Sequence, residues 1–336
     1  MESSFTKNKL LLIAPVFFDY YKEIMCEAQN MGLETSFICD APSNSNISKA
    51  IGRINKSLLR NNTEKYFRLK VLPTLQNTRY NYVLVVAGMT FSFTRDMVKE
   101  IRKFNPDAKF ILYQWDSEKN LPYVSSIHQY FDSVYSFDRI DCTSRDIYHF
   151  LPLFYTRAYE TIGKDVLTTF EYDCMYVGTA HPLKYKNINK MAISLKRRLP
   201  RQFIYHYMPS KLKYYYHKLS APEYKEAKLS DFHMEKVSKD ELLSLIRKSR
   251  CILDAPQAGQ TGLTIRSIEC LGAKRKLITS NPEIRKYDFY SKNNILVFED
   301  GQELNEAFFT SPYEEIDENI YSKYSLRSWL RTMLDE

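Results

Sequence analysis

The segment from Asp254 to Asn281 holds residue types that favour binding of an anionic ligand. An apolar run ends in Asp254, a loop with two glycines follows, and helical periodicity resumes from Gly262 to Gly272. Free backbone N–H groups at a helix start, together with the helix dipole, attract phosphate groups. The candidates for such contacts are Thr261, Gly262, Leu263, Thr264 and Arg266.

The helix that follows this loop has an apolar and a polar side. Helical spacing places four residues on the side expected to face a sheet: Thr264, Ile265, Ile268 and Leu271. Gly262, Arg266 and Glu269 form a neighbouring stripe at spacings of four and three. Arg266 is predicted to neutralise the charge of an anionic ligand, and Glu269 to accept hydrogen bonds from sugar hydroxyls. The alternatives are an ordinary strand–helix–strand unit, a solvated Glu269, or a surface ion pair between the two charged residues.

A second polar loop follows the strand predicted at Cys174–Gly178. Gly178 would let the backbone approach a pyrophosphate or an acceptor closely. Thr179 and His181 come directly after it and are predicted to contact an anionic ligand or stabilise its charge. A structural role for this histidine is the alternative.

Acidic residues just beyond predicted strands are candidates for a general base, which takes a proton from a hydroxyl within hydrogen-bond reach. Asp116 follows the strand predicted at 109–114, so it is the first candidate for a general base. The alternative is a helix cap or loop acid, which aspartate commonly is. Asp138 and Asp19, each also beyond a predicted strand, are the rival candidates.

The order of predicted elements indicates an α/β protein with doubly wound parallel sheets. The first series has strands at 9–14, 33–40, 82–88, 109–114, 133–137 and 150–154, and helices at 17–31, 46–62 and 94–104. The second has strands at 174–178, 202–207, 230–237, 251–254, 276–279 and 294–298, and helices after 182 and at 239–249, 262–272 and 316–334. With 336 residues, two domains are expected, at 1–160 and 170–312, with residues 313–336 returning to the first.

Several segments together resemble glycosyltransferases of the GT-B architecture. They are Phe131–Asp138 with Leu151–Tyr155, Tyr176–Gly178 with His181, and Asp254 through Tyr290. The similarity covers most of the chain and is to the group around capsule, exopolysaccharide and lipopolysaccharide synthesis, which includes spore-coat-type relatives. In many retaining members two glutamates lie seven positions apart, and the second holds the donor ribose. Glu269 matches that second position, whereas Thr261 stands at the first.

The resemblance implies two Rossmann-like domains facing a cleft, with the donor on the C-terminal domain and the acceptor on the N-terminal one. In that arrangement Arg266 would neutralise the leaving diphosphate, Thr179 and His181 would contact the donor, and Asp116 would take the proton from the acceptor hydroxyl. It implies a metal-independent, hexosyltransferase-type enzyme whose nucleotide sugar is a substrate, with no separate cofactor. The acceptor would be a cell-surface glycan or a lipid-linked molecule. Two alternatives remain open: a non-catalytic GT-B-like assembly or coat protein, and a polyol-phosphate transferase with a CDP donor.

Composition points to a cytoplasmic protein, free or peripheral at the inner face of the plasma membrane. The longest apolar run, Leu10–Phe18, has nine residues, whereas a spanning helix needs about 20. The six cysteines are scattered without paired spacing, so neither a disulfide framework nor a metal site is expected.

One segment, Lys184–Lys218, contains ten lysines and arginines and no acid, against a net charge of +8 for the whole chain. Tyrosines are interleaved with it, among them Tyr205, Tyr207, Tyr214, Tyr215 and Tyr216. Cations beside aromatic residues favour an anionic membrane surface. Nucleic acid is not expected as a partner, because the sequence contains no recognised nucleic-acid-binding module. A solvated basic helix with core tyrosines is the plain alternative.

Overall fold

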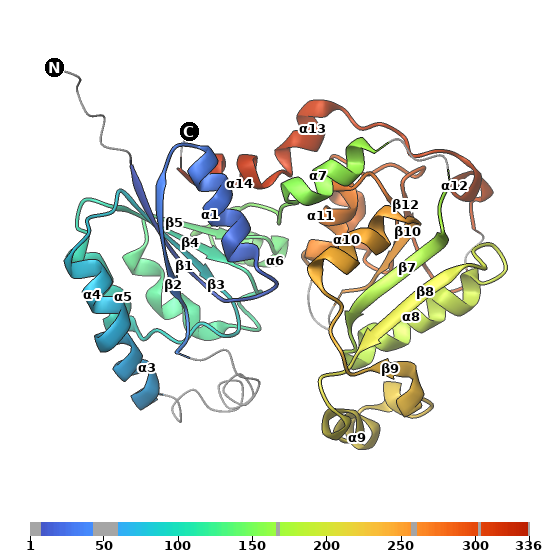
Figure 1. Cartoon of the computed structure of the whole chain (residues 1–336), viewed down its shortest axis with the longest axis horizontal. Coiled ribbons are helices and arrows are strands. Elements are labelled where there is room, and N and C mark those ends of the chain that lie inside the picture. The colour runs from blue at the N-terminus through green and yellow to red at the C-terminus, as the bar shows by residue number, and fades with distance from the viewer. Residues whose placement is uncertain (1–7, 43–59, 166–168, 257–260, 302–303, 335–336) are drawn as a thin grey trace. The chain divides into compact units, whose positions relative to one another are not determined.

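The computed structural model describes residues 8–42, 60–165, 169–256, 261–301 and 304–334. The chain divides into two compact units, residues 1–152 with 326–336 and residues 153–325. Each unit contains a six-stranded sheet, and the paired strands are parallel in both (Figure 1). The doubly wound α/β fold predicted from the sequence is therefore confirmed.

The first sheet has the strand order β2-β1-β3-β4-β5-β6. Its strands are β1 (Lys9–Ala14), β2 (Glu34–Cys39), β3 (Tyr82–Ala87), β4 (Lys109–Gln114), β5 (Ser133–Ser136) and β6 (Tyr148–Phe150). The continuous apolar runs of β1, β3 and β4 are typical of central parallel strands covered on both faces. From β1 the chain proceeds to β2 at one edge of the sheet, and from β3 it proceeds through β4 and β5 to β6 at the other edge.

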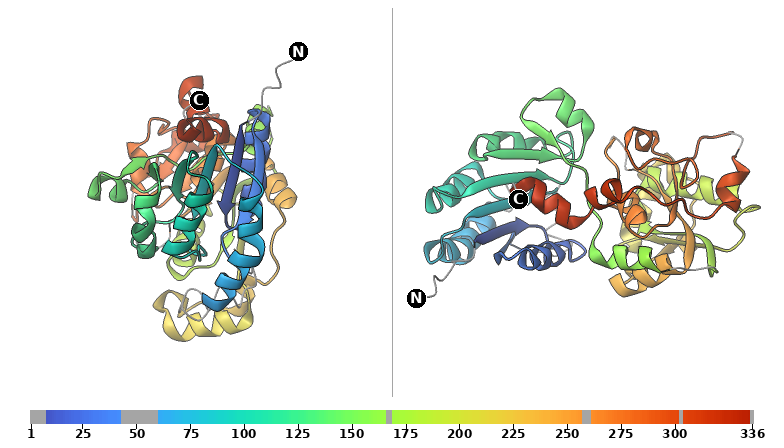
Figure 2. Two further views of the ribbon diagram at one scale, coloured as in Figure 1. Left: turned by 90° about the vertical axis from the view of Figure 1, so that its left-hand side faces the viewer. Right: turned by 90° about the horizontal axis from the view of Figure 1, so that it is seen from above.

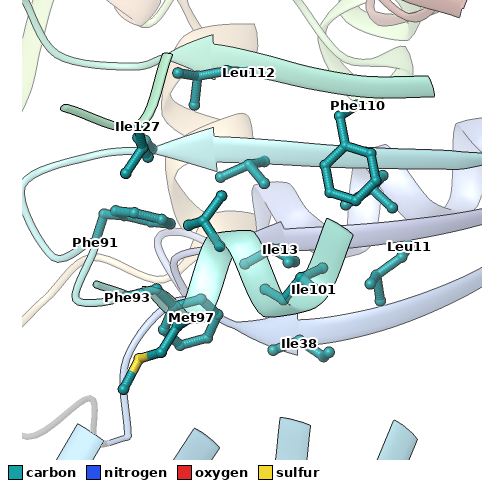
Figure 3. Close-up of a cluster of buried hydrophobic side chains, with 14 of the residues drawn as sticks. Leu11, Ile13, Ile38, Phe91, Phe93, Met97, Ile101, Phe110, Leu112 and Ile127 are labelled. Carbon is teal, nitrogen blue, oxygen red and sulfur yellow. The ribbon is translucent and has the colours of Figure 1, made fainter. Parts of the chain in front are cut away.

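Helices enclose this sheet and close its core. They are α1 (Tyr20–Asn30), α3 (Arg60–Tyr66), α4 (Leu72–Gln76), α5 (Arg95–Phe104), α6 (Arg139–Ser144) and α14 (Leu326–Leu334), with a π-helical turn at Phe67–Val71 and a 3-10 segment at Pro122–Tyr130. Met97 and Ile101 of α5 share one apolar cluster with Leu11 and Phe110 of the sheet (Figure 3). Amphipathic spacing of α5 thus fixes it on the sheet.

Helix α14 brings the C-terminal residues into the first unit, beside α1 (Figure 2). The ring of Trp329 packs edge-on against Tyr113 of β4, with their centroids 4.7 Å apart. Lys109 Nζ donates to the Met333 carbonyl at 3.1 Å. The apolar side of α14 is therefore part of the first core.

The second sheet has the strand order β12-β11-β10-β7-β8-β9. Its strands are β7 (Tyr172–Thr179), β8 (Gln202–Tyr207), β9 (Phe232–His233), β10 (Ser249–Asp254), β11 (Lys276–Thr279) and β12 (Ile295–Val297). Cys174 and Cys251 of the central strands lie in one cluster with Ile188, Met191 and Leu195 from the following helix. Parallel pairing and this shared cluster make β7 and β10 the centre of the unit.

The helices of the second unit follow the same alternation. They are α7 (Arg157–Lys164), α8 (Pro182–Leu195), α9 (Lys211–Ser220), α10 (Lys239–Arg247), α11 (Ile265–Gly272), α12 (Glu306–Thr310) and α13 (Glu318–Lys323), with 3-10 turns at Pro222–Tyr224, Leu229–Asp231 and Pro282–Lys286. Ser238 caps α10, and its Oγ accepts from the Glu241 amide at 3.2 Å.

Three expected elements differ in the structure. The strand expected at 230–237 is only Phe232–His233, because β8 ends at Tyr207 and offers no further pairing partner. The helix expected at 316–334 splits into α13 and α14, since the Tyr155 amide bonds to the Tyr324 carbonyl and Tyr155 bridges to Ser325. In place of the strand expected at 150–154, the structure has β6 at Tyr148–Phe150. Most of the helix expected at 46–62 lies outside the described residues.

In the described part of the chain, no helix has the length and apolarity needed to cross a membrane. Nor do the described residues contain a group of three or more His, Cys, Asp or Glu arranged to hold a metal ion.

Candidate functional site

The candidate site is the place in the second sheet where β7 and β10 lie side by side. From β7 the chain proceeds to β8 and β9, whereas from β10 it proceeds the other way, to β11 and β12. Open α/β sheets bind ligands outside the carboxyl ends of the strands at such a switch point. Here β7 ends at Thr179 and β10 ends at Asp254.

Asp254 connects the two helices that begin at this edge. Its carboxylate is almost fully buried. It pairs with Lys184 Nζ from the first turn of α8 at 3.3 Å, and it accepts from Ser267 Oγ of α11 at 3.0 Å. The Thr264 hydroxyl donates to the same carboxylate. The starts of α8 and α11 are thereby held together at the ends of β7 and β10.

The first residues of α11 are ordered by short polar contacts. Thr264 is the N-cap, and its Oγ1 accepts from the Ser267 amide at 3.3 Å. The Thr261 carbonyl accepts from Asn281 Nδ2 at 3.2 Å, while Gly262 and Leu263 are buried. The helix begins at Ile265, later than the periodicity from Gly262 indicated, because Thr264 takes the capping position.

Arg266 and Glu269 form an ion pair inside the unit, with Nη1 and Oε2 2.8 Å apart. The glutamate side chain has no exposed surface, and the arginine side chain is 18% exposed. Burial, followed by the negative charge of Glu269, raises the pKa of the Tyr159 phenol on α7. The interpretation of Glu269 as a solvated residue is wrong, because α7 packs against α11.

Position 178 requires glycine, because any side chain there would clash with Tyr176 of the same strand. A methyl group at its Cα would lie 2.5 Å from the Tyr176 hydroxyl and 2.8 Å from Cζ of that ring. The Tyr176 side chain is buried, and its hydroxyl has no hydrogen-bond partner among the described residues. Burial, followed by the charge of Asp254, raises the pKa of this phenol. An uncommitted hydroxyl therefore lies beside the end of β7.

The two other predicted residues of this loop lie at the same edge. Thr179 is the last residue of β7, and its carbonyl accepts from the His181 amide at 2.9 Å. His181 is the N-cap residue of α8, but its side chain makes no capping hydrogen bond. Both side chains are half-buried. The structure thus places Gly178, Thr179 and His181 at the end of β7, and Thr264 beyond the end of the neighbouring strand β10.

The candidate bases belong to the first unit. Asp116 follows β4, and its Oδ2 accepts from the Met89 amide beyond β3 at 3.0 Å. Its side chain is half-buried at the carboxyl edge of the first sheet. Asp138 is buried and caps α6 through the Ile140 amide at 2.9 Å. Asp19 pairs with Lys22 at 3.2 Å.

The loop after β1 presents aromatic residues at the same carboxyl edge. Phe17 and Phe18 are 46% and 58% exposed. Phe18 and Asp19 have φ values of 44° and 60°, which is costly for residues other than glycine. Such conformations are concentrated at functional sites. The ring of Trp115, next to Asp116, packs against Tyr20 with a centroid distance of 5.5 Å.

Sequence analysis missed four residues of the second-unit site: Asp254, Lys184, Ser267 and Tyr176. Asp254 carried a detectable signal, because an acid directly follows a buried run. Lys184 was counted only as part of the basic segment. No sequence signal separates this lysine from its neighbours, since its role depends on Asp254, far away in the chain.

Several solved structures of glycosyltransferases have the same arrangement. A glycosyltransferase from Rickettsia africae is 11% identical, with 98% of each chain covered and a TM-score of 0.57. Anabaena HepE in complex with UDP and glucose is 11% identical, with 98% of this chain and 100% of that chain covered and a TM-score of 0.55. The lipopolysaccharide outer core galactosyltransferase WaaB is 10% identical, with 97% and 99% covered and a TM-score of 0.50.

The chain has the GT-B fold. The resemblance derived from the sequence is thereby confirmed for the fold. No protein-family model and no curated protein matches the sequence. At identities near 10%, the similarity to these GT-B structures extends to the fold, and the chemistry has to be argued from the residues of this chain.

Proposed function

We propose that this protein is a glycosyltransferase that binds a nucleotide-sugar donor at the β7–β10 switch point of its second unit. One observation carries the proposal: Lys184 and the starts of α8 and α11 converge there around Asp254. Two helix N-termini and a lysine favour a diphosphate at this position. HepE, which has the same fold, was solved with UDP and glucose.

In the proposed reaction, bond cleavage leaves negative charge on the nucleoside diphosphate. Lys184 and Arg266 supply compensating positive charge, so the proposed mechanism needs no metal. The N–H groups around Thr264 and the hydroxyl of Thr179 orient the phosphates. Gly178 has no side chain, so it lets the backbone at the end of β7 approach them closely. His181 stabilises the developing charge. Because Glu269 is buried against Arg266, we assign it the role of holding that guanidinium in place.

For the acceptor we propose a sugar hydroxyl of a cell-surface glycan or a lipid-linked molecule, at the inner face of the plasma membrane. Asp116 is the proposed base, since its carboxylate lies at the carboxyl edge of the first sheet. The exposed rings of Phe17 and Phe18 provide faces on which a sugar can stack. The transferred group would be a hexosyl unit.

A thermal-shift screen of the full chain against UDP, GDP and CDP tests this proposal. Stabilisation by UDP or GDP supports sugar transfer, because a ligand that binds only the folded state raises the melting temperature. A preference for CDP would instead support transfer of a polyol phosphate. The absence of any shift at millimolar nucleotide would contradict donor binding and favour a non-catalytic assembly protein.

A further inference from the structure

Helix α9 has an apolar side that lies in solvent. Leu212 is 81% exposed and Leu219 is 90% exposed, and Tyr215 and Tyr216 are 54% and 65% exposed. These positions are separated by three, four and seven residues, so they form one stripe along the helix. We call these four residues the α9 stripe. A soluble protein normally turns such a stripe toward its core.

The opposite side of α9 is already used to attach the helix. Tyr214 is buried, donates to the Ala227 carbonyl at 3.0 Å, and packs on Phe232 with centroids 5.5 Å apart. Lys218 Nζ donates to the carbonyls of Lys225 and Ala227 at 2.7 and 2.8 Å. The helix is therefore firmly held in one orientation, and that orientation directs the α9 stripe outward. Figure 1 shows α9 at the periphery of the second unit, next to β9.

Charge around the stripe identifies the kind of partner. Lys211 flanks one side of the α9 stripe and Lys213 the other, at 100° per residue. The whole segment 184–218 contains no acid. Leucines at the centre, tyrosines beside them and lysines at the margins are typical of helices that lie in a membrane interface.

The ion pairs of the segment 184–218 argue against its acting as a purely electrostatic membrane anchor. Several of its cations have partners within the unit: Lys184 with Asp254, Lys190 with Asp300, Arg198 with Glu306 and Arg201 with Asp173. These charges are partly cancelled. The apolar area of the α9 stripe, by contrast, is not covered by any described part of the chain.

We propose that the α9 stripe inserts into the interface of an anionic lipid bilayer, with the flanking lysines at the headgroups. Three residues separate the end of β8 from the start of α9. The parallel strands β7 and β8 place this start at the carboxyl edge of the sheet that carries the candidate site. The Tyr224 hydroxyl, within the cluster under α9, donates to the Ala180 carbonyl of the β7–α8 loop at 2.8 Å. Bilayer docking would thus hold the donor site close to a lipid-linked acceptor.

This inference rests on the proposed function only in assigning a purpose to membrane binding, which is to bring the enzyme to a lipid-linked acceptor. Lipid binding is measured without nucleotide or acceptor, whereas donor binding is measured without lipid. The two proposals can therefore fail separately.

Co-sedimentation of the full chain with vesicles of phosphatidylcholine and phosphatidylglycerol tests the inference. Wild-type protein should bind these vesicles and should retain part of that binding at high salt, because apolar insertion is not screened. The variant Leu212→Ser with Leu219→Ser should bind about 100-fold more weakly, since burial of each leucine is worth roughly one tenfold step. Unchanged affinity in this variant would overturn the inference.

Ile193→Ser is the matched control, because Ile193 is 77% exposed but lies near the end of α8 that is distant from the carboxyl edge. It should bind vesicles like the wild type, and an equal loss would overturn the assignment to α9. Light scattering without lipid completes the test. A wild-type dimer that the leucine variant dissociates would show that a second copy covers the stripe, and it would overturn lipid insertion.

Discussion

Replacing Glu269 with alanine should destabilise the second unit markedly. The side chain is fully buried and its carboxylate lies 2.8 Å from Arg266 Nη1, so the change leaves a guanidinium in the interior without its counter-charge. Breaking a buried pair in this way costs about 3 to 5 kcal/mol. Because Arg266 keeps 18% exposure, we expect about 3 kcal/mol, the lower end of that range.

The assay is thermal unfolding followed by circular dichroism and calorimetry. For a unit of this size, about 3 kcal/mol corresponds to a fall in melting temperature of roughly 6 to 12 °C. Glu269→Gln should lose less, because the amide oxygen still accepts a hydrogen bond from Arg266. Glu283→Ala is the control: its partner Lys286 is largely exposed, so the loss should stay below about 1 kcal/mol. A Glu269→Ala transition within about 2 °C of the control would refute the buried-pair reasoning.

Three further predictions address other parts of the account. Gly178→Ala should cost about 1 to 3 kcal/mol by overpacking against Tyr176, and this penalty should disappear in a Tyr176→Leu background, as measured by chemical denaturation of the four proteins. Burial lowers the pKa of His206 to about 4. As the pH falls below about 6.5, the imidazole therefore becomes protonated in the unfolded chain but stays neutral in the folded chain. About 3 kcal/mol of stability should therefore be lost between pH 6.5 and 4, and less in His206→Gln than in the wild type when melting is followed against pH. Asp116→Asn should reduce the transfer rate at least about 100-fold with nucleotide affinity unchanged, and equal rates would exclude Asp116 as the base.

Much of the scaffold was predictable because buried parallel strands carry continuous apolar runs. The bounds of β1, β4, β8 and β11 agree with the predicted strands. The order of the strands was not predictable, because spacing along the chain does not reveal that β10 pairs with β7. The switch point, and with it the location of the donor site, therefore emerges only in the structure.

The candidate site shows the same division. The loops at 178–181 and 261–266 were identified from their glycines and polar residues, because such residues directly after an apolar run mark the end of a strand. The burial of Glu269 was not predictable, because it depends on α7, which occupies a segment that showed no strong periodicity. The pairing of Lys184 with Asp254 was equally hidden, as it joins residues that are remote in sequence.

The outward direction of the α9 stripe also required the structure. Its sequence, KLKYYYHKLS, contains two possible apolar sides. Contacts of Tyr214 and Lys218 decide which one faces the core. The tyrosines expected in the core accordingly divide, with Tyr214 buried and Tyr215 exposed.

The most direct measurement of the central claim is calorimetric titration of UDP and GDP into the wild type, Lys184→Gln and Lys186→Gln. Lys184 is 15% exposed and is held at the switch point by Asp254, whereas Lys186 is an exposed lysine of the same helix. We predict saturable binding of one nucleotide per chain, at least about 10-fold weaker in Lys184→Gln, because a charge-assisted contact to phosphate is lost, and unchanged in Lys186→Gln. Equal affinity in all three proteins, or no binding of either nucleotide to the wild type, would contradict the claim that this switch point is the donor site.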